Sequence, residues 1–317
     1  MSKTGFYTHS DCQRHDMGRG HPECPERLSA IRDRLLSTGV DHGLVEHEAP
    51  LAQEEDLLLA HDPRLVEAVS QLNREIQNAA AQGGRTLMHI DQDTAMNEHS
   101  WNAAMRGVGA AVAATDAVLA GELDNAFCAI RPPGHHATRS RSMGFCIFNS
   151  LAIAVLHALE RHGLERVAVI DFDVHHGNGT EDILAGDERV LMCSMFQHPF
   201  YPYCGTEDVA PNMVNVPVAA YTSGSVMRQL MAEHWFDRLE QFKPEMIFVS
   251  AGFDAHRDDD LGQLGMTEAD YRWITEQLMD IADRHSQGRM VSCLEGGYNL
   301  NALGRSVEAH LRALAHI

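Results

Sequence analysis

Hydrophobic positions along this chain form short apolar runs that alternate with longer stretches of mixed polarity. A continuous run of four to six apolar residues is typical of a strand buried on both faces, while apolar residues three and four apart predict an amphipathic helix. Strands are predicted at residues 126–130, 167–170, 190–194, 246–250 and 290–294. Helices are predicted at residues 25–38, 63–82, 100–121, 149–162, 180–185, 226–242, 267–285 and 300–315.

Local signals fix the ends of several of these helices. The helix at 25–38 is expected to end at Gly39 and to share one apolar face among Leu28, Ile31, Leu35 and Leu36. Thr267 is followed three residues later by Asp270, which is the spacing of a capping box. Three long loops remain, at residues 8–26, 87–99 and 196–211, and they are expected to shape the entrance to any ligand site.

The alternation of strand and helix predicts an α/β fold with three α/β/α layers around a mainly parallel central sheet. Nothing along the chain resembles a linker, so residues 1–317 are expected to form a single domain. In sheets of this kind, ligands bind beyond the carboxyl ends of the strands. Polar residues that directly follow a strand are therefore the first candidates for chemistry.

Charge and cysteine content restrict the class of protein. The formal net charge of −20 argues against nucleic-acid binding and favours weak attraction of cationic substrates. The seven cysteines contain no Cys-x-x-Cys pair and are expected to be reduced thiols. Without an apolar leader or an 18-residue apolar run, the chain is expected to be cytoplasmic and free of membrane contact. Association with further copies of itself is left open.

Candidate metal ligands follow two of the predicted strands. Asp173 and His175 come after the strand at 167–170 and are two residues apart, so their side chains leave the same side of an extended backbone. Asp254 follows the strand at 246–250. Two carboxylates and one imidazole leave a coordination position free, as catalytic rather than structural zinc sites do.

Two further segments supply acid–base and oxyanion chemistry. His135 and His136 follow the strand at 126–130, and Asp171 and Asn178 are available as partners for their ring nitrogens. A carboxylate behind one imidazole and an amide behind the other would move the two pKa values apart, which suits general acid–base catalysis. Tyr298 follows two glycines after the last strand and could donate a hydrogen bond to a developing oxyanion.

Taken in order, these segments resemble the histone deacetylase family over nearly the whole chain. The motifs that carry the resemblance are His21-Pro22-Glu23 with Pro25-Glu26-Arg27-Leu28, residues 131–136, 144–149, 171–179, 250–254 and 295–298. Class I members have an aspartate where this chain has Asn178, so the resemblance is closer to class II.

The resemblance implies a role for each of these positions. Asp173, His175 and Asp254 would bind Zn²⁺, with Fe²⁺ as the alternative ion in cells. His135 and His136, backed by Asp171 and Asn178, would be the catalytic histidines, and Tyr298 would polarise the carbonyl. A structural K⁺ is implied at Asp171, Ser194 and the backbone carbonyls of Asp173, His175 and Met195. The implied substrate channel comprises Asp93, Gly144, Phe145, Tyr201, Leu261 and Gly296, with Phe145 and Tyr201 as its aromatic walls.

The implied reaction is hydrolysis of the amide of acetyl-lysine to lysine and acetate. The main alternative is an amidohydrolase of acetylpolyamines or other small acylated amines on the same scaffold. Polyamine-selective members carry a glutamate at the position of Leu261, although Asp258, Asp259 or Asp260 could replace it if one faces the channel. An arginase-like binuclear manganese enzyme would need more carboxylates. A member that binds without turnover is disfavoured because every expected catalytic residue is present.

Overall fold

The computed structural model describes residues 2–317, and its centre is an eight-stranded sheet in which every neighbouring pair is parallel. The strand order is β2-β1-β5-β10-β9-β6-β7-β8. The strands are β1 (Thr4–Thr8), β2 (Leu44–Glu48), β5 (Asn125–Cys128), β6 (Val167–Asp171), β7 (Val190–Gln197), β8 (Met213–Val218), β9 (Met246–Ala251) and β10 (Met290–Leu294). The parallel sheet predicted from the alternating pattern is confirmed.

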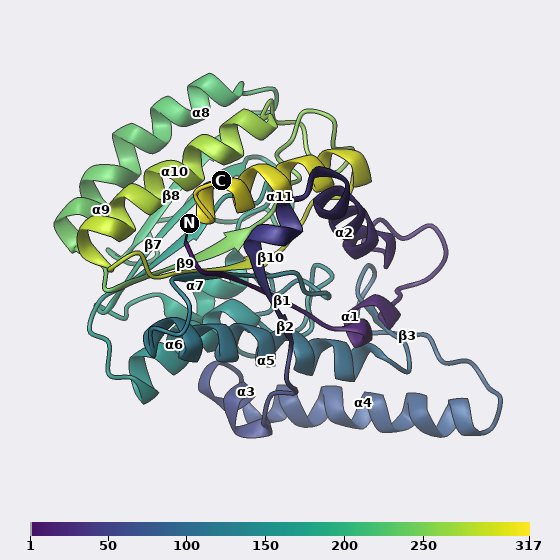
Figure 1. The fold of residues 1–317 in the computed structure, drawn as a ribbon. Coiled ribbons are helices and arrows are strands. Elements are labelled where there is room, and N and C mark those ends of the chain that lie inside the picture. The colour runs from purple at the N-terminus through teal and green to yellow at the C-terminus, as the bar shows by residue number, and fades with distance from the viewer. Residues whose placement is uncertain (1) are drawn as a thin grey trace.

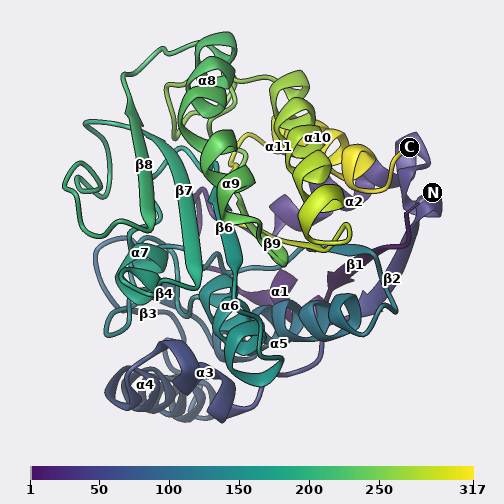
Figure 2. The ribbon, with the colours of Figure 1, turned by 90° about the vertical axis from the view of Figure 1, so that its left-hand side faces the viewer.

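Helices cover both faces of this sheet (Figure 1). One layer contains α5 (Ser100–Leu119) and α6 (Ser150–Arg161), with α3 (Glu54–Ala60) and α4 (Pro63–Ala81) packed outside them (Figure 2). The opposite layer contains α2 (Glu26–Thr38), α8 (Gly224–Met231), α9 (Asp237–Phe242), α10 (Glu268–His285) and α11 (Leu300–Leu314). Helix α7 (Asn178–Leu184) follows β6. The three-layer prediction is therefore also confirmed.

The five predicted strands and all eight predicted helical segments are present, with small shifts at their ends. The capping box at Thr267 and Asp270 is formed at the start of α10. The segment predicted as one helix at 226–242 is helical throughout, but a π-helical turn, η2 (Ala232–Phe236), separates α8 from α9. Leu36 was wrongly placed on the buried face of α2: it is 53% exposed, while Leu28, Ile31 and Leu35 are buried.

Several short elements were not predicted. Edge strands β2 and β8 are only partly buried, so their sequences lack a continuous apolar run. The first long loop contains the five-residue helix α1 (Ser10–Arg14), and the second contains the hairpin of β3 (Met88–His89) and β4 (Ala95–Met96). A 3₁₀ turn, η1 (Val40–Gly43), leads into β2.

The sheet brings the polar segments together at one edge. Strands β5, β10, β9 and β6 are consecutive neighbours, and each is parallel to the next. Their carboxyl ends therefore lie side by side, and the chemically suggestive residues follow directly from those ends. All seven cysteines are free thiols. Within residues 2–317, none of the helices has the length and apolar character that a membrane span needs.

Candidate metal centre and active site

Three ligand-type side chains converge beyond the ends of β6 and β9. His175 Nδ1 lies 2.9 Å from Asp173 Oδ1 and 3.3 Å from Asp254 Oδ2. One ligand atom from each residue lies within 4.8 Å of the others, and both carboxylates are buried. The residues predicted as a metal-binding set are thus brought together on neighbouring parallel strands.

The surroundings of these side chains fit a cation. Asp254 Oδ2 is buried without a hydrogen-bond partner among residues 2–317, and burial together with the neighbouring Asp173 carboxylate raises the pKa of Asp254 to about 7. A divalent ion would neutralise both carboxylates and occupy that unpaired oxygen. Gly296 donates its N–H to Asp173 Oδ2 at 2.8 Å, and a Cβ at Gly296 would lie 2.0 Å from Asp254 Oδ2. Only glycine lets this backbone approach the carboxylates so closely.

The tandem histidines have the two partners expected from the sequence. His135 Nδ1 lies 3.0 Å from Asp171 Oδ2, and His136 Nδ1 lies 2.7 Å from Asn178 Oδ1. Burial opposes protonation of His135, but the carboxylates of Asp173 and Asp171 outweigh it and raise its pKa well above the usual value. Burial, reinforced by the neighbouring His135 and His175, holds the pKa of His136 well below its usual value.

These contacts also decide which nitrogen of His136 can accept a proton. Asn178 Oδ1 can only accept a hydrogen bond, so His136 Nδ1 must donate it. The neutral ring then carries its lone pair on Nε2. The ring of His136 lines the pocket described next, so His136 is able to act as a base there.

A narrow pocket of about 240 Å³ leads to these groups. Its lining residues are Asp93, His136, Gly144, Phe145, His175, Phe200, Tyr201, Leu261 and Tyr298. Five of the six predicted channel residues are among them, whereas Gly296 does not line the pocket and lies against the carboxylates of Asp173 and Asp254. Phe200 was not predicted as a wall: its ring stacks on His175, with centroids 5.3 Å apart.

The pocket is held open at Gly144, where φ is +57°. A Cβ there would lie 2.6 Å from the ring of His136 and 2.9 Å from Tyr201 Oη. The rings of His136 and Tyr201 can therefore lie this close to residue 144 only because glycine has no side chain.

Tyr298 is attached to the rest of the site through its backbone and its ring. Its N–H donates to Asp259 Oδ2 at 2.6 Å, and the Arg27 guanidinium lies 4.9 Å from the ring centroid. Arg27 also donates from Nε to the carbonyl of Gly297 at 2.7 Å and from Nη2 to that of Glu295 at 2.5 Å. Burial raises the pKa of the Tyr298 phenol well above its usual value, so the hydroxyl stays protonated as a donor.

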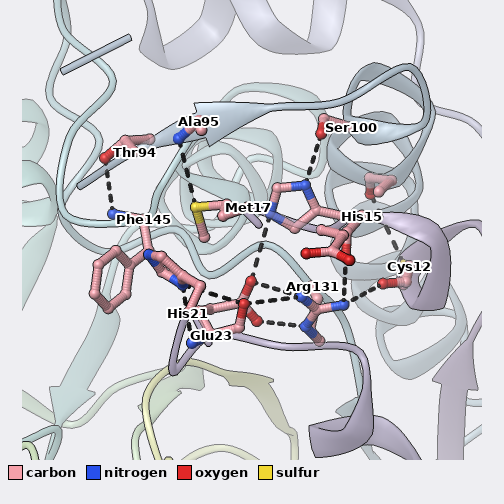
Figure 3. Close-up of polar contacts among 12 residues, drawn as sticks. Cys12, His15, Met17, His21, Glu23, Thr94, Ala95, Ser100, Arg131 and Phe145 are labelled. Atoms are coloured by element: carbon pink, nitrogen blue, oxygen red, sulfur yellow. Dashed lines mark hydrogen bonds and ion pairs between the residues drawn. The ribbon is translucent and has the colours of Figure 1, made fainter. Parts of the chain in front are cut away.

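A buried ion network that was not predicted joins the first entrance loop to the segment after β5 (Figure 3). Glu23 accepts from Arg131 Nη2 at 2.7 Å and from Arg27 Nη1 at 3.1 Å, and all three side chains are fully buried. Arg131 also donates to the backbone carbonyls of Cys12 and His15. The sequence contained both halves of this network in the motifs at 21–28 and 131–136, but an ion pair 108 residues apart has no local signature.

Glu295 is a second functional residue to which sequence reasoning gave no role. Its Oε2 accepts from the N–H groups of Gly134 and His135, and its Oε1 accepts from Ser250 Oγ. The carboxylate thus fixes the backbone that carries the two histidines. Burial raises the pKa of Glu295 to about 7.

Three of the five residues predicted for a potassium ion lie on two paired strands, and the other two, Asp173 and His175, follow the end of β6. Asp171 and Ser194 are register partners on β6 and β7, and Met195 follows Ser194 on β7. Ser194 Oγ is buried without a hydrogen-bond partner among residues 2–317. An unpaired hydroxyl beside a buried carboxylate fits a cation with oxygen ligands.

Both the sequence and the fold of this chain are similar to those of known proteins. The family described as "Histone deacetylase domain" matches residues 21–314. A histone deacetylase-like amidohydrolase from Pseudomonas aeruginosa is 38% identical over 287 residues, covering 88% of this chain and 73% of that protein. A probable deacetylase from Archaeoglobus fulgidus is 35% identical over 305 residues, covering 94% of this chain and 82% of that protein.

A solved structure is also similar. The crystal structure of the HD domain of HDA15 superposes with a TM-score of 0.89 at 32% sequence identity, covering 99% of this chain and 88% of that one. The likeness therefore extends over the whole α/β/α architecture, including the edge strands that were not predicted.

Proposed function

The chain belongs to the histone deacetylase family, and we propose that it is a zinc-dependent deacylase that hydrolyses acetyl-lysine in proteins or peptides. The observation that carries this proposal is the set of residues that meet in the pocket. His136, His175 and Tyr298 line the same pocket, and His175 belongs to the cluster that it forms with the buried carboxylates of Asp173 and Asp254. We further propose that residues 1–317 form one catalytic domain.

Members of this family are metal-dependent, and Asp173, His175 and Asp254 are the residues that would hold the ion. When bound, a divalent ion supplies Lewis-acid polarisation of the amide carbonyl and lowers the pKa of a water molecule. We favour zinc, because two carboxylates and one imidazole with an open position match its catalytic sites, while Fe²⁺ suits the same ligands. We also propose that a K⁺ ion binds at Asp171 and Ser194, next to the divalent ion, and has a structural role.

The protein's own groups would carry out the proton transfers. Nε2 of His136 accepts a proton from the water as its oxygen bonds to the carbonyl carbon, and the Tyr298 hydroxyl donates to the oxyanion that forms. The carbon–nitrogen bond then breaks as His136 returns the proton to the leaving amine. His135 keeps its proton and stabilises the negative charge nearby.

The lining of the pocket supports a lysine side chain over a polyamine. Leu261 offers no charge to an internal ammonium, which would lose its hydration without a partner. None of the three aspartates before it lines the pocket: Asp259 is buried against the backbone of Tyr298, Asp258 contacts Arg305, and Asp260 is exposed.

A substrate panel tests the proposal. The protein is stripped with a chelator, reloaded with Zn²⁺ or Fe²⁺, and given an acetyl-lysine peptide, acetylspermidine and free acetyl-lysine. We expect acetate release after reloading and a higher kcat/KM for the peptide. A tenfold preference of the unmodified protein for acetylspermidine would establish the polyamine alternative. Activity that persists without a metal would contradict the proposed mechanism.

A single substitution sharpens this panel. Leu261→Glu places a carboxylate on the pocket wall, so the ratio of kcat/KM should move at least several-fold toward acetylspermidine. Leu261→Gln has a similar size without the charge and serves as the matched control. An equal shift in both variants would mean that shape, rather than charge, decides between the substrates.

A further inference from the structure

A second group of metal-ligand side chains lies outside the active site, between α5 and α6. It consists of Asp116 near the end of α5, His157 in α6 and His162 directly after α6. His157 Nε2 lies 2.7 Å from Asp116 Oδ1, and His162 Nε2 lies 2.6 Å from the same oxygen. One ligand atom from each of the three residues lies within 4.8 Å of the others.

The arrangement is that of a metal-ligand set. Both imidazoles donate Nε2–H to the same carboxylate oxygen, and within residues 2–317 the second oxygen of Asp116 accepts no hydrogen bond. With an ion bound, each ring would carry its proton on Nδ1 and offer the Nε2 lone pair as a ligand. The ring centroids of His157 and His162 lie 5.3 Å apart with an interplanar angle of 66°. Two imidazoles bound to one Zn²⁺ at about 2.0–2.1 Å have centroids roughly 5 Å apart, so a small shift of the side chains would admit the ion.

The cluster is both ordered and accessible. The side chain of His157 is 12% exposed, that of His162 33% and that of Asp116 51%. His157 is thus held by packing, while the exposed carboxylate leaves room for an ion to enter with water completing its coordination.

The cluster lies far from the proposed catalytic centre along the strand direction. Helix α5 leads into β5 and α6 leads into β6, so both helices finish at the amino edge of the parallel sheet (Figure 1). The active site is at the carboxyl edge. An ion at Asp116, His157 and His162 would therefore connect two packed helices and would not contact the substrate.

We propose that Asp116, His157 and His162 form a second divalent transition-metal site that clamps the end of α5 to the end of α6. Two neutral imidazoles and one carboxylate suit Zn²⁺, and also Ni²⁺ or Co²⁺, better than Ca²⁺ or Mg²⁺, which prefer oxygen ligands alone. With three protein ligands on the surface, the ion exchanges with solvent, and its effect is on the stability of the helical layer.

Counting the ions bound to the 317-residue chain tests this site separately from the catalytic one. After equilibrium dialysis against buffered free Zn²⁺, the unmodified protein should retain two zinc ions per chain. His162→Gln should retain one and keep its deacylase activity, while His175→Ala should retain one and lose activity. His42→Gln, which removes a histidine whose side chain is 87% exposed, is the matched control and should retain two.

Thermal unfolding provides a second measurement. Starting from protein whose catalytic site is already loaded, additional Zn²⁺ should raise the Tm by roughly a few degrees through preferential binding to the folded state. That rise should be absent in His162→Gln and in Asp116→Asn. One zinc ion per chain in the unmodified protein, or two in His162→Gln with the same rise in Tm, would overturn the second site. Either result would leave the proposed deacylase function untouched.

Discussion

Two adjacent imidazoles behave differently in this protein because of single neighbouring atoms. His135 faces a carboxylate and lies near a second one, whereas His136 faces an amide and lies between two other imidazoles. Their pKa values therefore move in opposite directions, as the sequence predicted from the presence of Asp171 and Asn178. One ring is prepared to hold a proton and the other to accept one.

Tyr298 gives a prediction at the level of one oxygen atom. Because its phenol stays protonated and lines the pocket, Tyr298→Phe should lower kcat by about 10²–10³-fold. The Tm should change little, since the ring and its contact with Arg27 remain. Steady-state kinetics and thermal unfolding measure the two effects. Tyr203→Phe, at a residue that is 74% exposed, is the control, and a loss below tenfold in Tyr298→Phe would reduce the tyrosine to a packing role.

The candidate site could be predicted from the sequence wherever a residue's chemistry is apparent beside a strand end. The three candidate metal ligands and the two histidines directly follow strands. Because these strands are parallel neighbours, the sequence was enough to predict that the side chains converge. Glu295 could not be assigned, since its role is to accept from two backbone N–H groups 160 and 161 residues away. Gly296 was predicted to line the channel and does not, for a similar reason. The role of a glycine depends on which atoms of distant residues approach it, and the sequence does not show them.

At the scale of elements, helix α2 links the first entrance loop to the loop after β10 that carries Tyr298. Its residue Arg27 donates to carbonyls on both sides of Gly296 and packs under Tyr298, while its charge faces Glu23. These contacts add to the hydrogen bonds that the N–H groups of Gly296 and Tyr298 donate to carboxylates, and they hold the two glycines before Tyr298 in place. Arg27 is thus a positioning residue that acts through the loop after β10.

This link predicts a selective loss of turnover. Arg27→Lys keeps a positive charge for Glu23 but cannot make the forked contacts to two carbonyls, so the Tyr298 hydroxyl should be misplaced. We expect kcat to fall about 10–100-fold while KM changes less than threefold. Separate kcat and KM values, with the affinity for a hydroxamate inhibitor, provide the readout. If Tyr298→Phe and Arg27→Lys lowered kcat additively when combined, the two residues would not act through one hydrogen bond.

Elements were predicted well when their own sequence decided their structure. The five predicted strands, β5, β6, β7, β9 and β10, are buried along their whole length and read as apolar runs, and α10 carries its capping box in the sequence. Edge strands β2 and β8 become strands because a neighbour offers backbone hydrogen bonds, which no local pattern records. The π-helical turn between α8 and α9 likewise has no residue signal of its own.

A second prediction at this scale concerns the buried ions that attach the first loop to the end of β5. Burial would raise the pKa of Glu23, but Arg131, His15 and Arg27 outweigh it and hold that pKa well below its usual value. Glu23→Gln would leave two buried guanidiniums without their counter-charge, and the free energy of unfolding at pH 7 should fall by about 3–5 kcal/mol.

The pH dependence of that loss follows from the sign of the shift. A carboxyl whose pKa is depressed in the folded state contributes stability above its unfolded pKa, about 4.3, and loses it as the pH falls toward the folded value. The difference between the unmodified protein and Glu23→Gln should therefore be constant above about pH 5 and shrink below about pH 4. Denaturant unfolding at several pH values measures it, and a difference that grew on acidification would contradict the assignment.

At the scale of the whole molecule, the excess of acidic residues gives a prediction about substrates. A net charge of −20 produces a negative potential that attracts cationic peptides from beyond contact distance. Among residues 2–317, Asp93 is the one carboxylate that lines the pocket wall, so most of the effect should be long-range and screened by salt. An acetyl-lysine peptide flanked by arginines should show a kcat/KM several-fold higher at low ionic strength than at about 0.5 M salt, where the Debye length is a few ångströms. The same peptide with glutamine in place of arginine should change little, and its kcat should be the same. If both peptides responded equally to salt, the dependence would reflect the catalytic site, and the surface charge would have no part in choosing the substrate.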